Sequence, residues 1–264
     1  MIKFVIIGEQ CQDIFIYGKC KRLSPEAPVP VFLPTNTVSS QGMAANVVNN
    51  VGAIAHTMYQ KTGKMFDVFH KLSVNENIKT RYVDEKTNHY FIRVDEGDET
   101  HNSIKFTKSD LKKIAFADII LVSDYNKGFL TENDIVTINN YRNQENSYLL
   151  MDSKRLITNK LLRTVDFFKM NESEYQANVN NLGIEVMKKK EAKIIITKGE
   201  KGATYKKTDY IGNSHRSSDV SGAGDTFFAA LGVSLGYGEN LKESIVNANN
   251  FASEVVLKRG VSTI

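Results

Sequence analysis

Cysteine is scarce in this chain of 264 residues, which contains only Cys11 and Cys20. Neither cysteine belongs to a C-x-x-C pair or to the Cys/His spacing of a metal site, so the sequence offers no zinc-binding motif. A reducing compartment is the simplest interpretation of two isolated cysteines. The five histidines form no metal-binding motif either, and we expect surface or loop positions for His56, His70, His89, His101 and His215.

Long hydrophobic runs and a strong charge of either sign are missing as well. No apolar run approaches the roughly 20 residues that span a membrane, and the first residues resemble a strand and not a signal peptide. The net charge is +4, and the lysines are scattered along the chain. This argues against nucleic-acid binding and suits a small anionic substrate. We therefore expect a cytoplasmic protein without a membrane or nucleic-acid partner.

The chain does contain a regular alternation of short apolar runs and helical patterns. Continuous β-branched runs predict strands that are buried on both faces, as in a parallel sheet covered by helices. These runs lie at residues 4–7, 119–122, 148–151, 167–170 and 194–197. Helices are predicted at residues 44–51, 108–116, 131–141, 172–179, 224–235 and 241–257, with Ser109 and either Thr131 or Asn133 as N-caps. The pattern predicts an α/β fold, a mainly parallel sheet flanked by helices, in a single domain over residues 1–264.

Two segments interrupt this alternation. Residues 79–95 are typical of a hairpin with a polar turn at 84–88. Residues 13–33 also look extended, because the prolines at 25, 28 and 30 are incompatible with a helix. Together they predict a small antiparallel sheet outside the main one, a β-lid placed over a site. A surface hairpin without function is the alternative.

The clearest chemical signal is residues 219–226, Asp-Val-Ser-Gly-Ala-Gly-Asp-Thr. Small residues before an apolar run predict a tight loop that leads into a helix, where unpaired backbone N–H groups attract anions. A carboxylate beside a phosphate is unfavourable as a ligand, so Asp225 is easier to understand as a base that deprotonates an attacking hydroxyl. The stretch therefore predicts phosphoryl transfer to an alcohol. A generic turn is the alternative, and neither a Walker A loop nor a Rossmann fingerprint is present.

Polar residues also follow two of the predicted strands, at the edge where open α/β sheets bind ligands. Asn171 and Glu174 could hold a hydrated Mg²⁺ or orient phosphates. Taken alone, the pattern favours the alternative, a helix N-cap with an acidic first turn. Thr197 and Gly199 close another predicted strand and could contact a nucleotide, or simply form a turn.

A further set of residues suits the binding of a sugar. Asp13, Gly42 and Asn46 lie near the first strand and the first helix, where they could leave room for sugar hydroxyls and hydrogen-bond them. Arg22 and Lys127 are candidates for binding a second anion, although isolated cations are usually just solvated.

These residues together resemble the ribokinase-like (PfkB) carbohydrate kinases over essentially the whole chain. Within that family the chain is most similar to the kinase domain of bacterial D-glycero-β-D-manno-heptose 7-phosphate kinases, which serve ADP-heptose synthesis. Stretches 17–31 and 121–128 carry the similarity to this subgroup, and 219–226 is the general signature. Weaker matches lie at 44–46, 171–174, 197–199, 248–249 and 260–263.

The resemblance implies roles on the phosphoryl side of the site. Asp225 would be the catalytic base. An anion hole for the transferring phosphoryl group would be formed by Gly222, Ala223 and Gly224. Asp219 and Ser221 match positions that coordinate K⁺ in many relatives. ATP would lie along Thr197, Gly199 and Asn249, with Mg²⁺ held through water by Asn171 and Glu174.

The resemblance also implies roles on the sugar side. The sugar would be contacted by Asp13, Gly42 and Asn46, and its phosphate by Arg22 and Lys127. The two extended segments match the family's β-lid, which pairs two subunits in many members, so a homodimer is expected.

The chain departs from the family pattern in four places. The usual Gly-Asp at the end of the first strand is Gly8-Glu9, and Gln41 replaces the first of two glycines. The usual Asp-Pro-Lys becomes Asp-Ser-Lys, with Ser153 at the changed position. The segment 52–81 is shorter than expected and lacks a strand–helix portion.

We therefore expect an ATP-dependent kinase that acts on the anomeric hydroxyl of heptose 7-phosphate and gives the 1,7-bisphosphate. Two alternatives remain open. The changes on the sugar side could adapt the pocket to a hexose or hexose phosphate, and the fold could serve a non-catalytic sugar-phosphate-binding protein.

Overall fold

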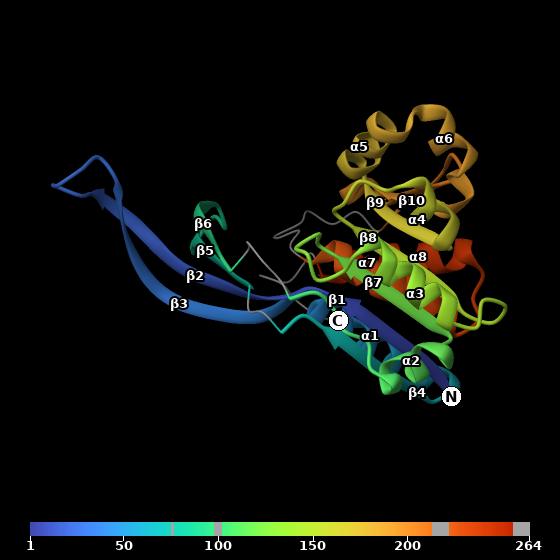
Figure 1. Ribbon diagram of the computed structural model, residues 1–264. Coiled ribbons are helices and arrows are strands. Elements are labelled where there is room, and N and C mark those ends of the chain that lie inside the picture. The colour runs from blue at the N-terminus through green and yellow to red at the C-terminus, as the bar shows by residue number, and fades with distance from the viewer. Residues whose placement is uncertain (75–76, 98–101, 213–221, 256–264) are drawn as a thin grey trace.

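The computed structural model describes residues 1–74, 77–97, 102–212 and 222–255, and its body is an eight-stranded sheet between two layers of helices (Figure 1). The strand order is β12-β11-β10-β9-β8-β7-β1-β4. The six strands β10, β9, β8, β7, β1 and β4 run parallel to one another. β11 pairs antiparallel with both β10 and β12. Their bounds are β1 Ile2–Gly8, β4 Phe66–Leu72, β7 Ile119–Asp124, β8 Tyr148–Ser153, β9 Phe167–Asn171, β10 Ile194–Thr197, β11 Ala203–Tyr205 and β12 Thr208–Tyr210.

Helices cover both faces of this sheet because its central strands are apolar on both sides. Phe4 and Ile6 of β1 belong to one buried cluster, and Val5 and Ile7 belong to the other. The first cluster contains side chains of α1 (Ala44–Thr62), α7 (Ala223–Gly236) and α8 (Leu241–Val255). The second is covered by α2 (Lys108–Ala115), α3 (Glu132–Tyr141), α4 (Asn159–Thr164), α5 (Glu172–Leu182) and α6 (Ile184–Lys189).

Capping side chains explain where several helices begin. Thr131 caps α3 through a reciprocal pair of hydrogen bonds with Asp134, as one of the two predicted alternatives had it. The prediction of Ser109 as the cap of α2 was wrong. Thr107 fills that position, because Asp110 lies three residues after it and completes the reciprocal pair.

The second sheet has four strands in the order β3-β2-β5-β6. Their bounds are β2 Gln10–Leu23, β3 Pro30–Met43, β5 Asn77–Asp84 and β6 Tyr90–Glu96. Because β2 pairs parallel with β5, the sheet is mixed and not antiparallel as predicted. It also reaches Met43, ten residues beyond the predicted end at 33. The β2–β3 hairpin projects far from the body, at the left of Figure 1.

The α/β fold class predicted from the sequence is confirmed, and all five predicted strands lie within β1, β7, β8, β9 and β10. Two features of the region 44–81 were missed, since α1 continues to Thr62 and β4 follows it. The last two residues of the predicted 241–257 helix lie outside the described residues. No helix in the described part of the chain is long and apolar enough to cross a membrane.

The sheet brings the functional residues together at one edge. In the parallel registers, Gly8 pairs with Ser123, Asp124 with Ser153, and Thr197 with Asn171. The carboxyl ends of these neighbouring strands therefore face the same side of the molecule, where ligands of open α/β sheets bind.

Candidate active site

Asp225 lies in the first turn of α7 and is only 8% exposed. Gly222 caps this helix with φ of 84°, a conformation that favours glycine. Asn46 Nδ2 donates a hydrogen bond to Asp225 Oδ2, and the Tyr125 hydroxyl donates one to Oδ1, each at 3.1 Å. Both oxygens of the carboxylate are therefore held in place by neutral donors from other elements.

The environment of Asp225 prepares it to act as a base. The pKa of its carboxyl is raised to about 6, because burial and the charge of Asp152 raise it more than Asn46, Lys169 and Tyr125 lower it. A carboxyl with a pKa near 6 is ionised at neutral pH and is basic enough to accept a proton from a hydroxyl as that hydroxyl attacks.

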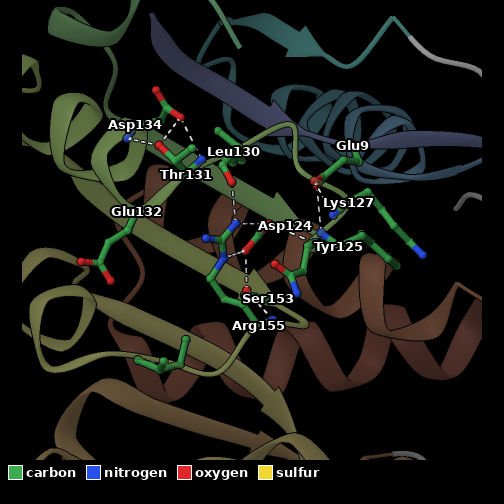
Figure 2. A network of polar contacts seen from close by, with 12 residues as sticks. Glu9, Asp124, Tyr125, Lys127, Leu130, Thr131, Glu132, Asp134, Ser153 and Arg155 are labelled. Carbon is green, nitrogen blue, oxygen red and sulfur yellow. Dashed lines mark hydrogen bonds and ion pairs between the residues drawn. The ribbon is translucent and has the colours of Figure 1, made fainter. Parts of the chain in front are cut away.

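The Tyr125 loop is held by Glu9, at a position where the family usually has aspartate. Glu9 is fully buried, and its carboxylate accepts hydrogen bonds from the backbone N–H groups of Tyr125 (2.9 Å) and Lys127 (3.1 Å). Figure 2 shows Glu9 reaching this loop from β1. Burial, and then the charge of Asp124, raise the pKa of Glu9. Glu9 therefore positions the loop that carries Tyr125 and is not among the residues that line the cavity beside Asp225.

A second anchor of the same loop is Asp124, whose side chain is fully buried. The guanidinium of Arg155 makes two hydrogen bonds to Asp124, and the hydroxyl of Ser153 makes a third at 2.5 Å (Figure 2). Ser153 stands where the family usually has proline, and the hydroxyl gives that position a hydrogen-bonding function. The loop after β7 is thus fixed by buried carboxylates on both sides.

A cavity of about 430 Å³ lies beside Asp225, a size suited to a small molecule. We refer to the four-stranded sheet β3-β2-β5-β6 as the lid, after the prediction. The cavity is lined by residues of this sheet and of the body: Asp13, Met43, Lys79, Arg81, Arg93, Tyr125, Lys127, Lys154, Gly222 and Asp225. Five of these side chains are cationic and two are carboxylates, so the cavity is suited to an anionic ligand.

Asp13 lines the cavity, and Gly42 lies directly against its carboxylate. Asp13 is buried and makes an ion pair with Arg81 of β5. A Cβ at Gly42 would lie 1.9 Å from Asp13 Oδ2, so only glycine leaves room for this carboxylate. Gln41, the residue that replaces the family's other glycine, is exposed and accepts a hydrogen bond from Asn49.

The lid supplies a buried lysine at this cavity. Lys79 of β5 is 9% exposed, and its ammonium lies 5.2 Å from the centre of the Tyr125 ring. Within the described residues it has no ion pair with a carboxylate. Arg22, by contrast, is exposed on the projecting hairpin and is not among the residues that line the cavity.

The profile of the "pfkB family carbohydrate kinase" matches residues 1–264. The chain belongs to the pfkB family of carbohydrate kinases. It is therefore a sugar kinase, an enzyme class that acts on small-molecule sugars and implies the use of ATP and Mg²⁺.

Curated relatives of this pfkB kinase include the "Bifunctional protein HldE" of Helicobacter acinonychis, 30% identical over 98% of the chain, and that of Nitratiruptor sp., 28% identical over 99%. The chain spans 64% and 63% of the lengths of these relatives. Among solved structures, ribokinase from Thermotoga maritima has a TM-score of 0.71 at 17% identity, covering 98% of this chain and 94% of its own. Phosphofructokinase-2 from Escherichia coli, in complex with potassium, has a TM-score of 0.66 at 13% identity, with 98% and 94% covered. These structural similarities show a shared fold.

On the nucleotide side of the kinase, the predicted residues also serve the fold. Asn171 and Glu174 form a reciprocal cap at the start of α5, with both hydrogen bonds at 2.8 Å. The other oxygen of Glu174 makes an ion pair with Lys154. The structure therefore confirms the alternative from the sequence analysis, that Asn171 and Glu174 cap a helix. A role in binding Mg²⁺ through water stays a prediction.

The other predicted nucleotide residues lie at the same edge of the sheet. The hydroxyl of Thr197 donates to the carbonyl of Met170, and Gly199 opens a 3-10 turn with φ of 57°. The side-chain amide of Asn249, on α8, donates to the carbonyl of Tyr210 at 2.7 Å. Asp219 and Ser221 lie outside the described residues, and within those residues no group of three or more His, Cys, Asp or Glu could hold a metal.

Several residues of the site were not predicted as site residues from the sequence. Tyr125 lies 100 residues before Asp225, so nothing local indicates that they meet. Lys79 is one lysine among many until the lid brings it to the cavity. Lys169 and Asp152 form a buried ion pair on neighbouring strands. Lys169 interrupts the apolar run 167–170 and Asp152 follows the run 148–151, but neither charge indicated that the two residues pair.

Proposed function

We propose that the chain catalyses ATP-dependent phosphoryl transfer to the anomeric hydroxyl of heptose 7-phosphate, giving heptose 1,7-bisphosphate. The observation that carries the proposal is the placing of a buried carboxylate, Asp225, at the mouth of a helix N-terminus and beside a cavity lined by five cations. A base alone would suit any sugar, but a cationic cavity favours an acceptor that already carries a phosphate. The similarity to proteins named HldE supports the same substrate class.

In this mechanism Asp225 accepts the proton of the anomeric hydroxyl while that oxygen forms its bond to the γ-phosphorus of ATP. The bond from phosphorus to the leaving oxygen breaks, and ADP departs. The backbone N–H groups of Gly222, Ala223 and Gly224 point from the start of α7 toward the phosphoryl group in transit and stabilise its charge.

Mg²⁺ would be held beside Asn171 and Glu174. An amide and a carboxylate supply oxygens, which suit Mg²⁺, and their existing bonds leave outer-sphere contact through water. When bound, the ion neutralises charge on the ATP phosphates. A K⁺ site at Asp219 and Ser221 stays a prediction from the sequence, because both residues lie outside the described residues.

The sugar would contact Asp13, Gly42 and Asn46, which adjoin the cavity or hydrogen-bond Asp225. We assign the binding of the 7-phosphate to Lys127, from the loop after β7, and to Lys79 of β5, since both residues line the cavity. Arg22 would serve the same purpose only from the lid of a second subunit, because it lies on the projecting hairpin.

A homodimer paired through the lid accounts for apolar side chains that the lid exposes. Phe91, Ile92 and Val94 of β6 are 40%, 56% and 39% exposed. Leu33 of β3 is 49% exposed. Such side chains on a thin sheet favour an interface, and light scattering of the purified chain would give its mass directly.

The experiment that tests the function is ADP release over a sugar panel: heptose 7-phosphate, the free heptose, hexose 6-phosphates and free hexoses. We expect heptose 7-phosphate to give the highest kcat/KM. A hexose phosphate in first place would assign the chain to the alternative kinase activity. Binding of sugar phosphates without any ADP release would instead identify a non-catalytic binding protein.

A further inference from the structure

We infer that Lys169 is a further catalytic residue, whose ammonium contacts the phosphoryl group in transit at the start of α7. The inference rests on the proposed function, since it concerns the same transfer step. The sequence analysis did not name Lys169 as a candidate site residue. It lies on β9 of the central sheet, next to Gly224 in the first turn of α7.

Lys169 is held in place by a buried ion pair. It lies on β9 directly opposite Asp152 of β8, and its Nζ donates to Asp152 Oδ2 at 2.7 Å. The two side chains are 5% and 7% exposed. Burying both charges is costly in the absence of further partners, and Asp152 Oδ1 has no hydrogen-bond partner among the described residues. The pair is therefore poorly explained as a device for stability alone.

The position of the ammonium relative to α7 supplies the second observation. A Cβ built on Gly224 would lie 3.0 Å from Lys169 Nζ. The ammonium thus lies against the first turn of a helix, in the space that the missing side chain of Gly224 leaves open. The N-terminus of a helix carries partial positive charge and repels cations. A lysine placed there raises the positive potential at a point where the backbone N–H groups already converge.

The ammonium of Lys169 and the N-terminus of α7 repel each other, but both attract an anion that binds between them. A phosphoryl group at the N-terminus of α7 would face the N–H groups and the ammonium together, and its charge grows on the equatorial oxygens during transfer. The base is close to the same pair, because Asp225 directly follows Gly224 in the first turn of α7. In keeping with this, Asp152 raises and Lys169 lowers the pKa of Asp225. Lys169 keeps its protons throughout and acts by charge, while the proton of the sugar goes to Asp225.

The test compares three variants of the full chain: Lys169→Met, Asp152→Asn, and the two combined. Lys169→Met alone leaves a buried carboxylate without its cation, so its Tm should fall. The double variant removes both charges and should recover much of that Tm. If Lys169 acts on the phosphoryl group, the double variant still loses roughly 100-fold in kcat, as expected for one lost charge-stabilising donor, with little change in KM for the sugar phosphate.

Two results would overturn the inference. One is a double variant with restored Tm and wild-type kcat, which makes the pair structural. The other is an Asp152→Asn variant that keeps its Tm but loses turnover about 100-fold, because that assigns the effect to the carboxylate and not to the ammonium. Failure of the proposed function is recognised separately, as absence of sugar-dependent ADP release in the wild-type chain.

Discussion

Replacing Tyr125 with phenylalanine isolates the effect of one hydrogen bond on the catalytic base. The phenol donates to Asp225 Oδ1 at 3.1 Å, and burial, followed by the charge of Asp225, keeps the pKa of this phenol well above its ordinary value. The hydroxyl therefore stays protonated, and it stabilises the ionised form of Asp225. The ring of phenylalanine would fill the same space between Lys79 and Lys154.

The size of the effect follows from the bond that is lost. A hydrogen bond to a charged group contributes about 1.5–3 kcal/mol, and one pKa unit corresponds to about 1.4 kcal/mol. At the lower end of that range, the pKa of Asp225 rises by about one unit from its value of about 6. Because the base must be ionised, the acid limb of kcat/KM against pH moves to higher pH. Activity then falls about tenfold well below the limb and little at pH 8.

The assay is ADP release measured from pH 5 to pH 9 for the wild-type chain and the variant. Tyr237→Phe is a matched control, because its hydroxyl donates to the carbonyls of Ala55 and Lys64, away from the site. It should leave the limb in place. A Tyr125→Phe variant with an unshifted limb would refute the claim that Tyr125 tunes the base, whatever its effect on the rate.

Two further substitutions test the sugar side. Lys79→Met should raise KM for a sugar phosphate about tenfold or more, the loss expected for one charge-assisted contact of about 1.5 kcal/mol, and leave KM for ATP unchanged. Lys86→Met, in the exposed turn after β5, is its control, and equal effects from both lysines would remove Lys79 from the phosphate site. Gly42→Ala places a Cβ 1.9 Å from Asp13 Oδ2, so it should displace Asp13 and raise KM for the sugar. Steady-state kinetics of that variant with unchanged KM would show that Asp13 does not contact the sugar.

The parts of the fold that were predictable from the sequence are those decided by local pattern. The central strands β1 and β7 are continuous apolar runs because helices cover both of their faces. β4 was missed because it is an edge strand in which Asp67, His70 and Lys71 interrupt the apolar residues. The part of β3 beyond residue 33 was missed because its stability comes from pairing with β2 and not from its own polar sequence.

The residues of the candidate site also divide into those that a local sequence pattern predicts and those that only the complete fold brings together. The small residues before α7 are a local pattern, so Asp225 was predicted as the base from the sequence alone, and the structure shows it buried beside the cavity. Glu9 and Ser153 were visible only as departures from a family pattern. Their function became clear once the backbone of the Tyr125 loop and the carboxylate of Asp124 were seen beside them. Contacts between residues far apart in the chain, such as Tyr125 with Asp225, depend on the complete fold.

The central claim is that Asp225 is the base for phosphoryl transfer to an anionic sugar. Its most direct test is the rate of ADP release with heptose 7-phosphate for the wild-type chain and for Asp225→Asn, together with the ATP affinity of both by calorimetry. The account predicts sugar-stimulated turnover in the wild type, a fall of about 10²–10⁴-fold or more in the variant, and similar ATP affinities. An Asp225→Asn variant with full sugar-dependent turnover would contradict it.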